Sequence, residues 1–160
     1  MRRAIVKWVV IGLAAFLIVI QFIQPRRTNP PVIAAHTLQA HMEVPAQVQS
    51  ILKRSCYDCH SSATVWPWYS HVAPVSWFVI SHVNGGRRHI NFQDWNAQVN
   101  TEKGKENLGR ICNLVRDGSM PLASYRIMHK DSYLSAQDVN TLCAWSQKVG
   151  TPPDSGKKAN

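Results

Sequence analysis

The feature that most constrains this chain is an apolar run over residues 4–23. Lys7 and Gln21 are its only strongly polar residues. A helix of about twenty residues spans roughly 30 Å, which is the thickness of the hydrocarbon core of a bilayer. We therefore predict one N-terminal transmembrane helix within residues 1–24, and the remaining chain must build its fold without this segment.

A cleaved signal peptide is the competing interpretation of the same run. Its apolar core is usually shorter, about 7–15 residues, and a cleavage site with small residues follows closely. Here the nearest such site, around Val32-Ile33-Ala34, lies well past the run and beyond Arg26-Arg27. An uncleaved anchor is therefore favoured. Basic residues flank the run on both sides, so the positive-inside bias is small.

Composition divides the chain after the anchor into three parts. Residues 25–44 form a linker and the approach to a domain, and Pro25 with Asn29-Pro30-Pro31 favours an extended backbone that holds the domain slightly off the membrane. Residues 45–150 form one globular domain. Residues 151–160 are Pro, Gly, Lys and Asp in large part, and we expect a disordered tail there.

The net charge of +9 limits the class of partner. The basic residues are scattered or paired, and no basic stripe carries the stacking aromatic residues of a nucleic-acid-binding protein. We therefore expect no nucleic acid. Anionic lipid, or an acidic docking surface on a redox protein partner, makes better use of this charge.

Hydrophobic residues recur at helical spacing in the domain, and no segment alternates convincingly in the manner of a β-strand. The last helix has the clearest signals, because Ser135 and Asp138 resemble a capping box, and Leu134 and Val139 can form a hydrophobic staple. The expected helices cover residues 45–56, run from Pro74 to a stop at Gly85-Gly86, cover residues 108–118, and continue from Ser135. The fold class is therefore all-α.

The sequence Cys56-Tyr57-Asp58-Cys59-His60 carries the chemistry of the chain. Its two thiols have the spacing needed to add across the two vinyl groups of one haem, and the histidine that follows lies beneath the iron as an axial ligand. A zinc site would need a second close pair of ligands, and a dithiol redox motif would need a βαβ context. Neither is present in the sequence, so we predict one covalent haem c held by Cys56, Cys59 and His60.

Met120 is the candidate for the second axial ligand of the haem iron. It lies in Gly118-Ser119-Met120-Pro121, where glycine permits a tight loop and proline fixes the backbone that follows. The competing interpretation is an ordinary apolar loop residue. A histidine in this role would give a bis-His haem, and the candidates are His71, His82 and His129.

The chain resembles the bacterial haem-binding domain family, whose members carry one Cys-x-x-Cys-His site and are broadly similar to class I cytochromes c. The resemblance covers about residues 45–148. The matching residues are 55–62, 66–70, 73–77, 82–87, 91–92 and 120–122, with Tyr125, His129, Leu134, Ser135 and Trp145. The resemblance implies a cytochrome c-like helical domain around one haem. Because bacteria attach such haems outside the cytoplasmic membrane, it also implies a single-pass inner-membrane protein whose domain faces the periplasm.

Aromatic and basic side chains can complete a haem pocket. Trp66, Trp68 and Trp77 can pack against the flat apolar ring, as Trp95 can, and direct participation in electron transfer is the alternative. Arg87 and Arg88 can pair with the haem propionates, because a guanidinium fork suits a carboxylate. Simple surface charge is the alternative for both arginines.

Two further cysteines, Cys112 and Cys143, both fall on apolar helix faces. Outside the cytoplasm such a pair suggests a disulfide that ties two helices together, and buried free thiols are the alternative. Neither cysteine is followed by histidine, so we expect no further haem attachment at this pair.

These inferences lead to a functional hypothesis. We expect a membrane-anchored, monohaem c-type cytochrome that transfers electrons by cycling its iron between Fe(II) and Fe(III), and not an enzyme. One alternative is a haem-containing subunit of a larger membrane redox complex. Another is a haem enzyme or gas sensor, such as a peroxidase-like site, whose sixth ligand is displaceable.

Overall fold

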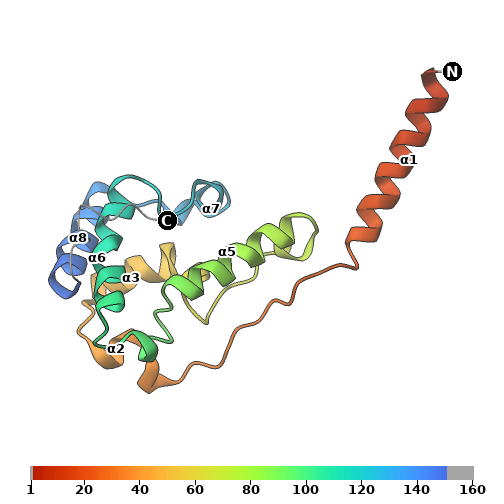
Figure 1. The fold of residues 1–160 in the computed structure, drawn as a ribbon. Helices are drawn as coiled ribbons and strands as arrows, with labels where there is room; N and C mark the ends of the chain where they lie inside the picture. Colours follow the sequence, from red (N-terminus) through yellow and green to blue (C-terminus); the bar gives the residue numbers. More distant parts are fainter. Residues whose placement is uncertain (1, 151–160) are drawn as a thin grey trace.

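The computed structural model describes residues 2–150, and its N-terminal helix stands apart from the other helices (Figure 1). This helix, α1 (Arg2–Ile20), is long and apolar enough to cross a membrane, judged by length and composition. Of its residues only Ile20, at the end nearest the domain, is buried. The prediction of one N-terminal apolar helix is confirmed. The predicted disordered tail lies outside the described residues.

Helices and irregular loops make up the rest of the described chain, and residues 2–150 contain no strand, so the all-α prediction is confirmed. The predicted helices correspond to α3, α5, α6 and α8, whereas the shorter ones were not predicted. The elements of the domain are η1 (Ala34–His36), α2 (Leu38–His41), α3 (Ala46–Ser55), α4 (Tyr57–His60), η2 (Trp68–His71), α5 (Val75–His89), η3 (Asn96–Gln98), α6 (Glu102–Arg116), α7 (Ala123–Met128), η4 (Lys130–Ser132) and α8 (Ala136–Val149).

Helices α3, α6 and α8 enclose the hydrophobic core. Leu52, Leu108 and Leu142, one from each helix, are fully buried in a single cluster of apolar side chains. Each buried leucine contributes about 1.5–3 kcal/mol by leaving water. Trp95, in the loop between α5 and η3, is buried in the same core.

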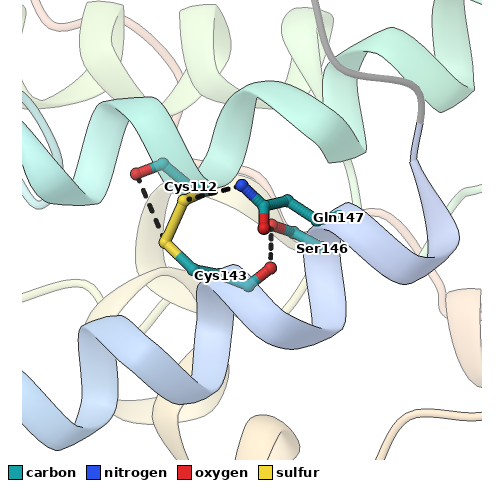
Figure 2. The surroundings of a disulfide bond; sticks show 4 residues. All are labelled: Cys112, Cys143, Ser146 and Gln147. Atoms are coloured by element: carbon teal, nitrogen blue, oxygen red, sulfur yellow. Dashed lines mark hydrogen bonds between the residues drawn. A yellow bond between two sulfur atoms is a disulfide. The ribbon is translucent and has the colours of Figure 1, made fainter.

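A disulfide joins α6 to α8 through Cys112 and Cys143 (Figure 2). The two Cα atoms lie 4.4 Å apart, and both residues are buried. Figure 2 shows the bond between the facing sides of the two helices, with the amide nitrogen of Gln147 3.6 Å from the Cys112 sulfur. This pair therefore forms the disulfide that the sequence suggested, and not two free thiols.

A capping box begins α8, as predicted. The Ser135 hydroxyl accepts a hydrogen bond from the Asp138 N–H at 3.1 Å, and the Asp138 carboxylate accepts one from the Ser135 N–H at 2.8 Å. Arg54 on α3 also binds this carboxylate, with Nη2 2.7 Å from Oδ2. Burial alone would raise the pKa of Asp138, but these partners outweigh burial and lower the pKa. Leu134 and Val139 are partly buried and both pack against the core, as expected for the two residues of a hydrophobic staple.

The prediction that α5 stops at Gly85-Gly86 is wrong, because the helix continues to His89. A Cβ atom on Gly86 would lie only 2.5 Å from the carbonyl oxygen of Cys59, so glycine is needed here for close approach to α4. Arg87, Arg88 and His89 consequently form the last turn of the helix and not a loop. Basic side chains at this end interact favourably with the helix dipole.

The segment after α1, from Gln21 into the linker, lies against the domain. The Gln21 side chain donates to the Ala73 carbonyl at 3.1 Å and accepts from the Ala73 N–H at 2.9 Å. The Trp77 indole donates to the Ile23 carbonyl at 2.6 Å. Two more side chains of the linker donate to domain carbonyls, namely Arg27 to Ser70 and Asn29 to Thr64. The linker is therefore not a simple spacer, since hydrogen bonds hold it along η2 and α5.

Candidate functional site

A cavity of about 510 Å³, which we call the main cavity, lies where α3, α4, α5 and α6 meet the loop between α6 and α7. In Figure 1 this loop arches across the upper side of the domain, with α3 and α5 below it. A cavity of this size can hold a cofactor, and its wall is largely apolar. Its apolar lining includes Leu52, Ile90, Phe92, Ile111, Leu114, Val115 and Leu122.

Cys56, Cys59 and His60 all line the main cavity. Helix α3 leads directly into α4, and the backbone N–H groups of Cys59 and His60 both donate to the Cys56 carbonyl. Burial raises the pKa of the Cys56 thiol to about 12 and that of the Cys59 thiol to about 11. Both thiols are free and stay protonated at neutral pH, unlike the reactive thiolates of dithiol redox motifs.

His60 is held so that one ring nitrogen is left for a metal. Its Nδ1 lies 3.1 Å from the carbonyl oxygen of Gly86 and 3.2 Å from that of Ile90. Carbonyl oxygens only accept hydrogen bonds, so Nδ1 carries the hydrogen and Nε2 keeps its lone pair. Burial lowers the pKa of His60, which favours the neutral ring that metal ligation requires.

Met120 lines the same cavity from the loop that follows α6. The loop turns at Gly118, whose φ of 74° is a conformation that glycine adopts without strain. The Met120 N–H then donates to the Leu114 carbonyl at 2.9 Å, which fixes the loop to the end of α6. The structure thus brings Met120 and His60 to the wall of one cavity, although they are far apart in the sequence.

These residues fit a haem: two thiols, an oriented imidazole and a thioether surround one apolar cavity. Among residues 2–150, by contrast, no cluster of three His, Cys, Asp or Glu side chains could hold a bare metal ion. The model of the family described as haem-binding domain matches residues 15–148, which is most of the chain. The chain belongs to this haem-binding domain family. No curated protein and no solved structure matches it.

The three histidines predicted as alternatives to Met120 differ in whether they line the main cavity. His82 lines the main cavity, and its Nδ1 donates to the Phe78 carbonyl at 2.8 Å, so its Nε2 keeps a lone pair. The Nε2 of His129 is hydrogen-bonded at 2.8 Å to the hydroxyl of Tyr69. His71 is exposed on η2 and does not line the cavity. Of the three, only His82 is placed to compete for the haem iron.

Of the two arginines predicted to bind propionates, only Arg88 lines the main cavity. Arg87 is turned away, because its guanidinium donates to four oxygens elsewhere, on Thr28, Asn29, Ser61 and Thr64. Arg110 and Asn107 of α6 line the cavity but were not predicted. The helical spacing places both on the same face as Ile111 and Leu114, but spacing alone does not distinguish a cavity-lining polar residue from surface polarity.

Trp66, Trp68 and Trp77, which were predicted to pack against haem, do not line the main cavity, and Trp68 lines the neighbouring second cavity described below. The Arg87 guanidinium lies over the Trp66 ring, 6.0 Å from its centroid. Trp77 binds the linker, as described above. Trp68 is 73 % exposed and meets Tyr69 edge to face. The contact of Trp77 depends on the segment after α1, which sequence patterns do not reveal.

A second cavity of about 330 Å³ lies between η2, α5 and α7. It shares Cys59, His82, Leu122 and Tyr125 with the main cavity, so the two are neighbours. The Tyr125 hydroxyl donates to the Asp58 carboxylate at 2.6 Å, which ties α7 to the haem motif. Burial and this carboxylate raise the pKa of Tyr125, so the hydroxyl stays protonated as the donor.

Proposed function

We propose that this chain is a membrane-anchored, monohaem c-type cytochrome that carries electrons and catalyses no reaction of its own. One observation carries the proposal: Cys56, Cys59, His60 and Met120 line a single apolar cavity. The first three come from one turn and the fourth from a distant loop, so the arrangement is not a consequence of sequence proximity.

The roles of the four residues follow from their chemistry. Cys56 and Cys59 would hold the haem through thioether bonds, and His60 and Met120 would ligate its iron. When bound, haem supplies a one-electron Fe(II)/Fe(III) couple. Two protein ligands would leave no position for a substrate, which supports a carrier over an enzyme.

The surroundings of these ligands suit electron transfer. With haem bound, the largely apolar wall would disfavour added positive charge beside the iron, and a methionine ligand would act in the same direction. Both features favour the reduced state and raise the potential relative to a bis-His site. Arg88 in the cavity lining can balance a propionate charge, whereas Arg110 already forms an ion pair with Glu106, with Nη2 2.6 Å from Oε1.

The location of the domain is part of the proposal. Helix α1 would anchor it in the cytoplasmic membrane, with the domain on the periplasmic side, where haem attachment takes place. The net charge of +9 would favour docking to acidic surfaces of redox partners. A permanent place in a larger membrane complex is compatible with the same features, and co-purification after mild detergent extraction tests it.

Optical spectra of the detergent-purified full chain test the proposal. We expect a c-type α band after reduction, a weak near-infrared thioether band in the oxidised form, and no shift with carbon monoxide. A protein without haem, made in a host able to attach it, would refute the proposal. A clear carbon monoxide shift would favour a haem enzyme or gas sensor.

Substitutions then identify the sixth ligand. Met120→Ala should abolish the thioether band, lower the reduction potential and admit carbon monoxide. Met128→Ala is the matched control, because this methionine is 53 % exposed on α7 and does not line the main cavity. If Met120→Ala changed nothing and His82→Ala did, the haem would be bis-His.

A further inference from the structure

The domain exposes a group of large apolar side chains near the end of α1, which we call the apolar face. Its members are Trp68, Val72, Val75, Phe78 and Met128, exposed by 73 %, 44 %, 45 %, 51 % and 53 %. All except Val72 line the second cavity, so they surround one region of the surface. Soluble surfaces rarely gather such side chains without a partner.

The apolar face begins where α1 ends. Gln21 is the first residue after α1, and both polar atoms of its side chain bind Ala73, which is next to Val72. Trp77 lies between Val75 and Phe78 in the sequence, and its indole N–H donates to the carbonyl of Ile23. In Figure 1 the N-terminal end of α5 lies toward α1, whereas α6 and α8 lie on the opposite side of the domain.

Charge near the apolar face favours one kind of partner. Residues 21–36, which follow α1 and include the first part of the linker, and residues 66–82, which they contact, contain no Asp or Glu. The carboxylate of Asp58 lines the second cavity and accepts a hydrogen bond from the Tyr125 hydroxyl. The same linker carries Arg26 and Arg27. Exposed apolar and aromatic groups beside arginines match the interface of a bilayer, where tryptophan sits at headgroup level and basic groups meet anionic lipid.

We propose that the apolar face rests on the lipid bilayer, so that the domain lies on the membrane surface in one fixed orientation. This inference rests on the proposed membrane anchoring of α1. A helix of 19 residues extends about 28 Å and fills the hydrocarbon core, which places Gln21 at its boundary. Ala73 is hydrogen-bonded to Gln21, so Val72 and Val75 lie at the same depth.

Fluorine NMR of the full chain tests this contact. The haem-loaded, reduced protein carries 5-fluorotryptophan and is placed in bilayer discs that contain anionic lipid and a lipid spin-labelled near the headgroup. Trp→Phe variants assign the signals. We expect the Trp68 and Trp77 signals to be lost together with that of Trp8 in α1. The Trp145 signal, from α8 on the far side, should persist.

Two outcomes would overturn the inference, and they differ. If the Trp8 signal is lost while those of Trp68 and Trp77 remain as sharp as that of Trp145, α1 is in the membrane but the apolar face is not. If the Trp8 signal also remains sharp, α1 does not lie in the bilayer and the proposed anchoring fails as well. Discs without the spin-labelled lipid supply the reference intensities.

Discussion

The two halves of the domain keep their shape by different means. Around α6 and α8, buried leucines and a disulfide join helices that pack directly on one another. Around α4 and α5, hydrogen bonds join the elements, and a cavity of about 510 Å³ lies between them and α6. The first half is held by direct packing and a covalent bond, whereas the second encloses the cavity that a haem would fill under the proposed function.

The contacts of the second half are individually weak. The bonds from His60 to Gly86 and Ile90, and from Tyr125 to Asp58, contribute about 0.5–1.5 kcal/mol each, or up to about 3 kcal/mol where a charge takes part. Filling the cavity with a haem would bury much of its apolar wall. The comparison therefore predicts that the haem stabilises the half around α4 and that the disulfide stabilises the half around α6.

The largest effect should come from the motif cysteines. In the variant Cys56→Ser/Cys59→Ser we expect loss of all covalently bound haem, because serine forms no thioether. Haem staining after denaturing electrophoresis and the intact mass both measure this. The matched control is Cys112→Ala/Cys143→Ala, which should keep its haem, since that pair lies outside the cavity lining. Equal haem loss in both variants would contradict the prediction that the haem belongs to the half around α4 and the disulfide to the half around α6.

Next in size is the effect of the disulfide on stability. Cys112→Ala/Cys143→Ala should lower the free energy of unfolding by about 3–4 kcal/mol, because the bond closes a loop of 31 residues in the unfolded chain. Denaturant titration in detergent measures the change. A loss below about 1 kcal/mol would mean that packing of α6 on α8 suffices without the bond.

Two adjacent glycines test the contact between α5 and the haem motif. Gly86→Ala should cost about 1–3 kcal/mol and alter the haem spectrum, because its Cβ would lie 2.5 Å from the Cys59 carbonyl oxygen. Gly85 also lines the main cavity, but a Cβ there would meet only a flexible arginine tip at 3.9 Å, so Gly85→Ala should stabilise the helix by about 0.5–1 kcal/mol. Denaturant titration measures the change in unfolding free energy of each variant, and absorbance measures any change in its haem spectrum. Identical behaviour of the two variants would contradict the close approach.

The smallest effect concerns Asp138 and pH. Its pKa is lowered in the folded chain, so it contributes stability above the unfolded pKa of about 3.9, and this contribution is lost as pH falls through the folded pKa. Asp138→Asn should cost about 1 kcal/mol at neutral pH and flatten the acid limb of the stability profile. Glu102→Gln, in an exposed pair with Lys105, should change neither.

Local signals in the sequence were sufficient for much of the first half. The capping box at Ser135 and the apolar periodicity of α6 describe interactions within a few residues, so they survive into the structure. The stop predicted at Gly85-Gly86 failed for the opposite reason. The role of Gly86 is set by Cys59, which belongs to another helix.

The same distinction holds for the site. The haem motif is compact in sequence and Met120 has a recognisable loop context, so both were found, and the structure places them at one cavity. Arg87 and Trp77 were assigned to the cofactor because no sequence pattern near them shows that they bind the segment after α1. In the structure Arg87 donates to the Thr28 carbonyl and Trp77 to the Ile23 carbonyl. Arg110 was missed because one basic residue on an amphipathic helix resembles ordinary surface charge.

The bonds between Gln21 and Ala73 also bear on how such a domain finds a partner. A domain on a flexible tether samples many orientations and a range of heights. When α1 lies in a bilayer and the linker is bonded to the domain, motion is reduced to lateral diffusion and rotation about the helix axis. The main cavity would then keep a constant height above the lipid. Under the proposed function, a redox partner would be selected by the height of its own redox centre as well as by charge.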